Sequence, residues 1–454
     1  MSDLAGIFSH GPVPPGIAQS NGLEYHPRER RDNYKADVAL GGILVFTVLL
    51  APIPVASNHP LAWLFWAIFL GLVATFRSAG TGLIRVPQSK SGRIAVGASS
   101  LFFFYSCLQA LQIYLPTGTN MPPFSLTPAA SFLGAIRVAS YIVFFLLMIS
   151  HSRRRKLSYT FARILFFGIA AHALAAMVAL NLLGDTALII EKSAYFGMAT
   201  GGFGNRNAFA TFLGMGLVLG LALTQNTSTH SRNRAAQFLS MLAFWTALAI
   251  ILNTLIATQS RMGIAATAAA SFLAFPRSAS GRAKPLAALA ALAIGLTAVF
   301  GQGLVERFGE LQFAASTRGD LYAQVWEMIR ARPILGHGLD SFPIAFEEYH
   351  KAPVTAGFVW DKAHSIYLTL WAEMGLVIGS IPIALGLIAG AKLWIKSNRN
   401  AENQQLALAA LAALALAALH SLIDFSMEIE ANMFLLLALI GLGLGGAGNS
   451  KGNS

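Results

Sequence analysis

The chain has 454 residues, of which 55% are hydrophobic and only 11% are charged. Soluble globular domains carry about a quarter charged residues, so this composition excludes an ordinary soluble fold and favours a protein embedded in lipid. The formal net charge of +12 would suit a nucleic-acid binder, but the charges gather beside apolar segments, so we expect membrane lipids and no nucleic acid as partners.

The chain begins with a polar, basic tail, residues 1–37, which lacks the apolar core and cleavage site of a signal peptide. Beyond it, apolar stretches approaching the roughly 20 residues of a membrane span recur along the chain. They indicate helices, since barrel strands would alternate polar and apolar residues over about ten positions. We therefore predict an all-α membrane protein of about 12 transmembrane helices. The predicted spans are 38–56, 61–76, 94–115, 131–150, 159–182, 206–224, 237–257, 263–276, 286–303, 366–390, 406–424 and 432–447.

The loops between these spans alternate in charge. Clusters of lysine and arginine follow every second span, whereas the opposite short loops, 57–60, 116–130, 183–205 and 425–431, contain only Lys192. Basic residues beside spans are retained in the cytoplasm. We therefore expect the basic clusters and both termini, including the tail 448–454, to be cytoplasmic, and the opposite loops to face outward.

One outward loop, residues 304–365, is longer and more polar than the others. It separates nine predicted helices in 38–303 from three in 366–447, and a loop of this kind commonly carries function. Within it, the segment 320–332 has apolar residues at helical spacing and is followed by Pro333 and turn glycines. We predict an amphipathic helix whose apolar face consists of Leu321, Val325, Met328 and Ile329.

Ionisable residues at the outer ends of the spans are the candidates for catalysis or substrate binding. A charge near hydrocarbon is costly, so it tends to be kept only where it has a function. Arg206 begins span six, Arg261 lies between spans seven and eight, and Arg318 lies early in the long loop. His364 ends that loop, and Glu373 follows in span ten. A further polar cluster, or simply a helix terminus, lies at the end of span eleven with His420, Asp424 and Glu428.

Three arginines on one face suit a phosphate-bearing lipid, because a guanidinium binds phosphate oxygens through paired hydrogen bonds and keeps its proton. A diphosphate leaving group needs such stabilisation, and a histidine could take the proton of an attacking hydroxyl. Taken singly, each arginine is equally well explained as a side chain extending to lipid headgroups, and His364 as an interfacial or helix-capping residue. The single cysteine, Cys107, excludes a cysteine cluster for zinc or an iron–sulfur centre.

The motifs around these residues resemble the O-antigen ligase and polymerase superfamily of bacterial membrane glycosyltransferases. The resemblance rests on Gly204–Ala210 (GNRNAFA), on Ser260-Arg261, and on Arg318 followed by Pro333–Gly338 (PILGHG). Its most specific part is His364–Leu368 (HSIYL) with Glu373-Met374-Gly375, where the long loop meets the next span. These motifs all lie in the second half of the chain, between residues 195 and 430.

The resemblance implies a multi-pass enzyme of the bacterial inner membrane that takes a glycan from undecaprenyl diphosphate on the periplasmic face, without a metal or other cofactor. A ligase transfers it to lipid A-core, which is the acceptor we expect, and the alternative is a polymerase whose acceptor is a second lipid-linked glycan. By this match the reaction inverts the anomeric configuration. His364 and Arg318 would be catalytic, Arg206, Arg261 and Arg318 would bind the diphosphate, and Asn205, Asn207 and Glu373 would support them.

A transporter or flippase for a lipid-linked anion is the alternative from another class, since buried arginines are common in transporters. Transporter sites usually lie at the midplane on broken helices that occur in two corresponding halves. The sequence has no such paired interruptions, and its polar candidates gather at one face. A purely structural assembly protein is the third reading.

Overall fold

The computed structural model describes residues 27–53, 55–81, 89–111, 124–224, 234–275, 304–357, 359–398 and 404–445. In these ranges the chain is helical and has no β-strand, which confirms the predicted all-α class. Five described helices are long and apolar enough to cross a membrane, and a bent pair makes a sixth if it counts as one span. The predicted span 286–303, residues 1–26 and the tail 448–454 lie outside the described residues. The total of about 12 spans therefore stays a prediction.

The first helices follow the predicted spans, with shifts at their ends. Helix α1 begins inside the predicted tail, because hydropathy marks only the apolar part of a helix that continues into polar residues. These helices are α1 (Pro27–Leu50), α2 (Pro60–Thr81), α3 (Lys90–Ala110), α4 (Pro128–His151) and α5 (Arg155–Leu182).

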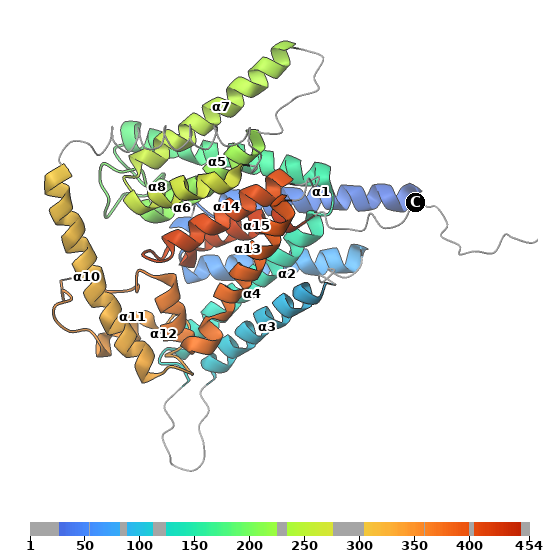
Figure 1. Cartoon of the computed structure of the whole chain (residues 1–454). Coiled ribbons are helices and arrows are strands. Elements are labelled where there is room, and N and C mark those ends of the chain that lie inside the picture. Colours follow the sequence, from blue (N-terminus) through green and yellow to red (C-terminus); the bar gives the residue numbers. More distant parts are fainter. Residues whose placement is uncertain are drawn as a thin grey trace, which may run out of the picture.

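Helix α6 (Arg206–Leu223) lies at the centre of the molecule, with α14 (Gln404–His420) and α15 (Glu430–Leu444) beside it (Figure 1). Its glycines permit close packing: a Cβ at Gly214 would lie 2.3 Å from the Thr267 hydroxyl, and one at Gly220 would lie 2.4 Å from Phe166. Small residues at such contacts are how helices approach closely in a membrane.

The alanine-rich segment 403–419 corresponds to α14, which packs against α6, α8 (Arg261–Ser271), α13 (Ile381–Asn398) and α15. Its short side chains allow these neighbours to surround it, and most of its residues are buried. Helix α7 (Arg234–Ala257) packs beside α5 and α6. The main apolar core lies among these helices.

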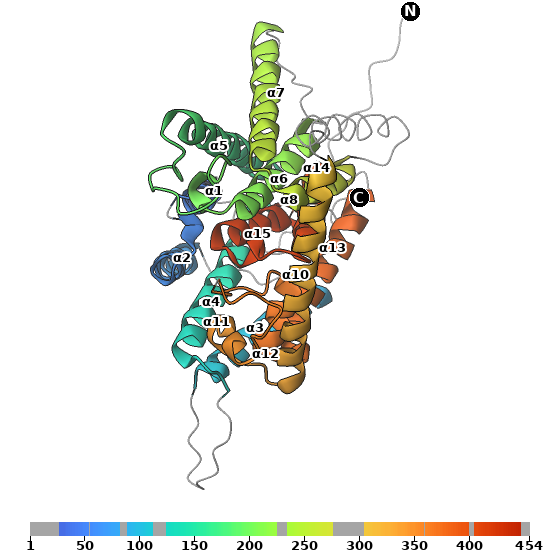
Figure 2. The same ribbon diagram turned by 90° about the vertical axis from the view of Figure 1, so that its left-hand side faces the viewer.

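The long loop folds around a second, smaller core at one end of the bundle. The predicted amphipathic helix is the C-terminal part of α10 (Leu304–Ala331), and its four predicted apolar residues are at most 1% exposed. They pack with α11 (Phe342–Ala345) and with α12 (Ile366–Gly379). Figure 2 looks onto this end and shows α10 crossing it.

The predicted span 366–390 is a bent pair of helices, which passes as a membrane span only when both halves are taken together. The chain forms α12 and α13, which are bent by 74° relative to each other. Gly375 has φ 74°, and a Cβ there would lie 2.1 Å from the Ile334 carbonyl oxygen, so the turn after α10 fits into the kink. Leu376 donates its backbone N–H to Pro333 at 2.7 Å. Hydropathy could not reveal the bend because both halves are apolar.

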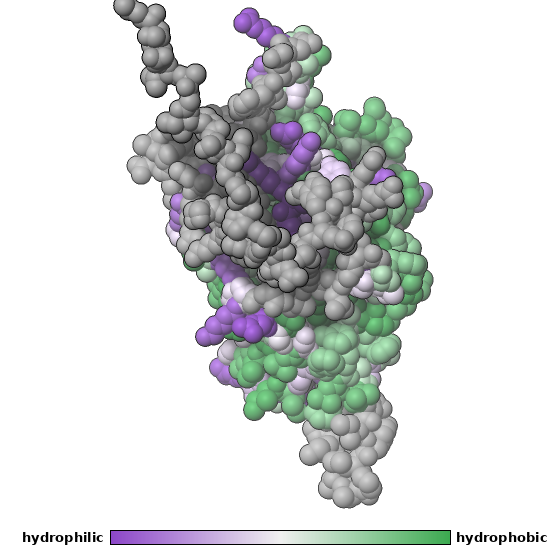
Figure 3. Space-filling view, turned by 90° about the vertical axis from the view of Figure 1, so that its right-hand side faces the viewer, coloured by the Kyte–Doolittle hydropathy of each residue, from purple (hydrophilic) through white to green (hydrophobic). Residues whose placement is uncertain are grey.

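The end opposite α10 gathers polar side chains in the middle, while apolar side chains cover much of the flank (Figure 3). Ion pairs link helices of the bundle: Asp37 of α1 accepts from Arg77 of α2 and from Arg154, which follows α4, at 2.6 Å each. An apolar flank around a polar end is the surface expected for a protein surrounded by lipid.

Candidate functional site

Arg206 and Arg261 are the first residues of α6 and α8. Asn205 and Ser260 precede them as N-caps, and each side chain accepts hydrogen bonds from backbone N–H groups of its own helix. The N-terminal end of a helix carries a partial positive charge and favours anions. Each arginine therefore adds a full charge to a helix end that already attracts phosphate.

Close packing of α6 and α8 brings these two helix ends together. A Cβ on Gly263 would lie only 2.6 Å from the Ala210 Cβ, so the first turn of α8 lies directly against α6. Ser260 donates its hydroxyl to the Asn207 side-chain oxygen at 2.8 Å. Asn207, predicted as a supporting residue, therefore joins the two caps.

The structure brings the three predicted arginines within electrostatic range of one another, since both Arg261 and Arg318 act on the Arg206 guanidinium. Arg206 itself donates to the Met198 sulfur at 3.1 Å and to the Gln259 carbonyl oxygen at 3.4 Å. Neither partner carries a negative charge. The positive charge of Arg206 is therefore not cancelled by these contacts and stays available to an anion.

Helix α10 carries Arg318 and also contacts the His364 main chain. Tyr322 lies one helical turn after Arg318 and donates its hydroxyl to the His364 backbone carbonyl at 2.8 Å. Residues four apart share a helix face, so Arg318 and Tyr322 both face the end of the loop. The His364 backbone has φ 53°, which is uncommon for a residue other than glycine. Its ring lies edge-on to Phe425, with ring centroids 5.3 Å apart.

The His364 ring is half-buried, and burial is the largest influence that lowers its pKa below the ordinary value. The nearby Arg318 lowers this pKa further, whereas Asp424 raises it. The Nδ1 atom has no hydrogen-bond partner among the described residues. His364 is thus a mainly neutral imidazole near pH 7, as a proton acceptor must be.

Asp424, which follows α14, is the acid that acts most strongly on the pKa of His364. It is 2% exposed, and its Oδ2 atom accepts from the Asn207 side-chain amide at 3.1 Å. Its Oδ1 atom accepts from the Ser426 backbone N–H at 2.8 Å. These bonds fix a carboxylate whose charge acts on the His364 imidazole and would stabilise its protonated form.

Glu373 lies apart from the arginines and supports the turn after α10. It is 4% exposed, and its carboxylate accepts from the backbone N–H groups of Asp340 at 3.0 Å and Phe342 at 3.1 Å. Its contacts therefore order the loop backbone. They suit a supporting residue that acts through the turn and not by binding phosphate.

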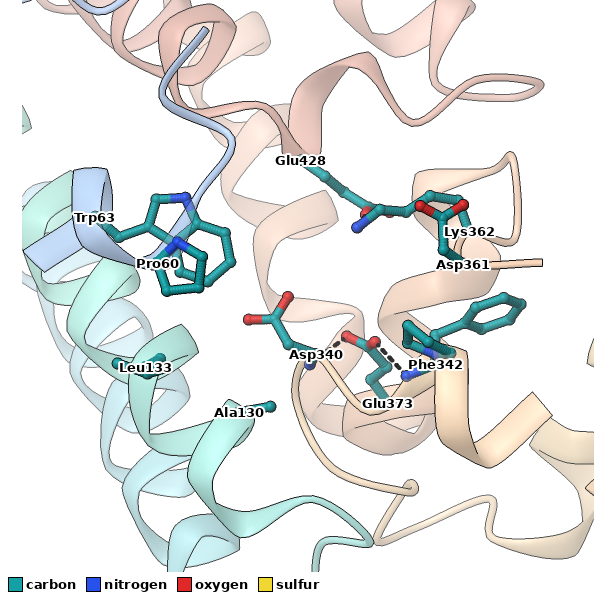
Figure 4. Close-up of a pocket in the computed structure, with 11 residues that line it drawn as sticks. Pro60, Trp63, Ala130, Leu133, Asp340, Phe342, Asp361, Lys362, Glu373 and Glu428 are labelled. Atoms are coloured by element: carbon teal, nitrogen blue, oxygen red, sulfur yellow. Dashed lines mark hydrogen bonds and ion pairs between the residues drawn. The ribbon is translucent and has the colours of Figure 1, made fainter. Parts of the chain in front are cut away.

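A pocket of about 210 Å³ opens beside this turn (Figure 4). Two ion pairs border it: Arg137 of α4 binds Asp340 at 2.7 Å, and Lys362 binds Glu428 at 2.8 Å. We call it the acidic pocket. Its lining residues are Pro60, Trp63, Ala130, Leu133, Asp340, Phe342, Pro343, Asp361, Lys362, Glu373 and Glu428.

The acidic pocket has four carboxylic residues and one lysine in its lining. Burial acts to lower the pKa of Lys362, but the neighbouring Glu428 carboxylate outweighs it, so this pKa is raised and the ammonium keeps its charge. The Arg137 guanidinium lies 4.3 Å from the centre of the Trp63 ring. Both cations are thus held by acids or an aromatic face, and the lining contains more acidic than basic residues.

Residues 246–383, from within α7 to the first turn of α13, match the family model described as O-Antigen ligase. This region belongs to the O-antigen ligase family. The match confirms the resemblance predicted from the motifs. No curated protein matches the chain.

The O-antigen ligase region contains Arg261, Arg318, His364 and Glu373, whereas Arg206 precedes it. In the described part of the chain, no three His, Cys, Asp or Glu side chains are grouped so that they could hold a metal ion. The family match over residues 246–383 and the apolar helices together support a ligase- or polymerase-type membrane glycosyltransferase.

Sequence reasoning left several residues of this end without a role. Arg137 was recognisable in the sequence as a charge inside an apolar span, but its partner, Asp340, lies about 200 residues further along the chain and could not be predicted. No local signal marked the others, which sit in polar loops or at a helix start where their residue types are ordinary. They are Trp63, Tyr322, Asp340, Asp361 and Lys362.

Proposed function

We propose that the protein transfers a glycan from undecaprenyl diphosphate to an acceptor hydroxyl on the periplasmic face of the bacterial inner membrane, with lipid A-core as the acceptor. The family match supports the class of reaction. The observation that carries the mechanism is that Arg318 links the arginines to the histidine, since it acts electrostatically on both Arg206 and His364.

In this mechanism the diphosphate lies against Arg206, Arg261 and Arg318. His364 removes the proton of the acceptor hydroxyl, whose oxygen forms a bond to the anomeric carbon as the bond from that carbon to the diphosphate oxygen breaks. Undecaprenyl diphosphate leaves with the electron pair of the broken bond, and the arginines stabilise the charge that develops on it. Attack opposite the leaving group inverts the anomeric configuration, and the step uses no metal ion.

The experiment is transfer by purified protein with a lipid-linked glycan as donor, comparing His364→Ala and Arg318→Ala with the parent chain. We expect each variant to lose at least about 100-fold in kcat, the usual cost of removing a general base or a leaving-group stabiliser. Lys351→Ala is the control, because Lys351 lies in the same loop but forms only an exposed ion pair with Glu327. EDTA should leave the rate unchanged. Full activity in both variants, with normal folding, would show the mechanism to be wrong.

The same assay distinguishes the possible acceptors. Product on lipid A-core establishes a ligase, and lengthened lipid-linked chains establish a polymerase, which is the alternative within the family. Movement of labelled lipid across vesicles without a new glycosidic bond would instead establish transport.

A further inference from the structure

We propose that the acidic pocket is the acceptor subsite and that it takes an uncharged, hydroxyl-rich sugar ring. This inference rests on the proposed glycosyl transfer and names the chemistry of the second substrate. It is supported by where the pocket lies, by the groups that line it and by the sign of its charge.

The pocket adjoins the proposed base. Asp361 and Lys362 line it and lie three and two residues before His364 in the chain. Asp361 and Glu428 both act electrostatically on the His364 ring, as Arg318 does. His364 is therefore within electrostatic range both of Arg318 and of two acids that line the pocket. In-line displacement needs the acceptor oxygen to approach away from the leaving diphosphate, and the pocket gives it a place to do so.

The lining groups suit sugar hydroxyls. Carboxylates accept hydrogen bonds from hydroxyl groups, and the pocket presents Asp340, Asp361 and Glu428 from three parts of the chain (Figure 4). The indole N–H of Trp63 and the Glu428 Oε1 atom are buried and have no hydrogen-bond partner among the described residues, so each would gain a partner if a bound sugar displaced its neighbours. The volume of about 210 Å³ is below the roughly 300 Å³ of a typical small-molecule site, which fits one ring and not an oligosaccharide.

The charge of the pocket distinguishes the two substrates. Both substrates carry sugars, but the donor also carries a diphosphate, which the arginines attract. A phosphate or carboxylate in the acidic pocket would meet the Asp361 carboxylate, while the nearby cations Arg137 and Lys362 are already paired with Asp340 and Glu428, so repulsion is not offset by a free cation of this pair. The sugar that receives the glycan should therefore bear no anionic group on the ring that enters.

A cation is a weaker candidate for this pocket. Three of its four acids already have partners: Glu373 accepts two backbone N–H groups, Asp340 binds Arg137 and Glu428 binds Lys362. The described residues also contain no group of side chains fit to hold a metal ion.

The test fills the pocket. Ala130 of α4 lines it, whereas its neighbour Ala129 is exposed and outside the lining, so Ala130→Phe and Ala129→Phe are matched variants. At saturating donor, Ala130→Phe should raise the acceptor KM by at least about tenfold, because a filled site excludes the ring. The donor KM should not change, and Ala129→Phe should behave as the parent chain does. One arm uses lipid A-core as acceptor, and the other uses a short-chain lipid-linked glycan that is separable from the donor.

Asp361→Asn tests the charge without adding bulk, at an exposed position where unfolding is not expected. The probes are one acceptor with a neutral terminal hexose and the same acceptor with that hexose phosphorylated. The parent chain should prefer the neutral acceptor by kcat/KM, and the variant should show a preference at least about threefold smaller.

The outcomes separate the two proposals. If the parent chain makes no glycosidic bond with either acceptor, the proposed function fails. If the parent chain transfers normally and Ala130→Phe, shown to be folded, leaves the acceptor KM unchanged or raises the donor KM equally, only the acceptor subsite fails. Equal use of phosphorylated and neutral acceptors by the parent chain would overturn the charge argument.

Discussion

His364 is held through its main chain, which leaves its ring for chemistry. Its carbonyl accepts from Tyr322, its φ of 53° sets the direction of the side chain, and Nδ1 has no partner among the described residues. A base fixed in this way keeps its position while its protonation changes. The charges of Asp424 and Arg318 then set its pKa from opposite directions.

The pH profile of the reaction should report this arrangement. Asp424→Asn removes a negative charge that raises the His364 pKa, so this pKa should fall further below its ordinary value. A general base acts only when it is deprotonated, so the acid limb of kcat/KM should move to lower pH, measured across roughly pH 5 to 8. Arg318→Gln removes a charge that lowers the same pKa and should move the limb to higher pH in the remaining activity. A limb that stays in place in both variants would mean that His364 is not the group that titrates.

The candidates Arg206 and Arg261 stand out in the sequence, because a charge beside an apolar segment is conspicuous wherever it occurs, and His364 stands out where the long loop meets a span. The structure brings Arg261 and Arg318 within electrostatic range of Arg206, and the roles of these residues stay predictions. Asp340 and Lys362 could not be found, because a charge in a polar loop is ordinary until packing buries it. Their importance depends on partners that only the tertiary structure brings near, Arg137 and Glu428.

At the scale of elements, the turn between α10 and α11 is held by three helices. Gln109 of α3 donates to the Leu335 carbonyl at 3.0 Å and accepts from the Leu339 N–H at 3.1 Å. Glu373 of α12 binds two of its backbone N–H groups, and Arg137 of α4 pairs with Asp340. The positions of α3, α4 and α12 therefore determine where the turn places Asp340 and Phe342 in the pocket lining.

Breaking the pair of Arg137 and Asp340 should release this turn. Arg137→Met leaves a largely buried carboxylate without its cation, which typically costs about 3–5 kcal/mol in the free energy of unfolding. We expect a lower unfolding temperature in detergent and faster proteolysis within 333–365. The double variant Arg137→Met with Asp340→Asn should recover part of the loss, because no uncompensated charge remains.

The exposed pair of Lys351 and Glu327 is the control for that experiment, since pairs of this kind contribute at most about 1 kcal/mol. If Lys351→Ala and Arg137→Met cost the same, the buried pair does not order the turn. The kink within α12 belongs to this scale as well. It depends on the positive φ of Gly375 and on the close approach of Ile334, neither of which hydropathy records.

At the scale of the whole molecule, two cores share one chain. The larger lies within the bundle, and the smaller lies under α10 at the end where the arginines and His364 occur. Span positions were largely predictable, because apolar length governs them, and most described helices begin and end near the predicted spans. The packing of α6 against α14 was not, because it depends on which glycines and alanines meet.

The predicted orientation can be tested with cysteine labelling, which the single natural cysteine makes simple. In a Cys107→Ala background, a cysteine at the exposed position of Lys351 should react with a membrane-impermeant thiol reagent in intact spheroplasts. A cysteine at the exposed position of Arg153 should react only after the membrane is opened. The reverse pattern would place the site in the cytoplasm, where no periplasmic glycan could reach it.

The turn after α10 packs against the kink at Gly375, and this contact limits how segments can be exchanged between related proteins. Ile334 rests against Gly375, and Leu376 bonds to Pro333, so the loop and the helix pair fit each other at backbone distance. A chimera that takes only the loop from a relative would place a foreign turn against the native helix pair, and the two backbones would not fit. New acceptor preferences should therefore arise, in nature or by engineering, through joint replacement of 333–342 and 366–379, and single-segment grafts should misassemble.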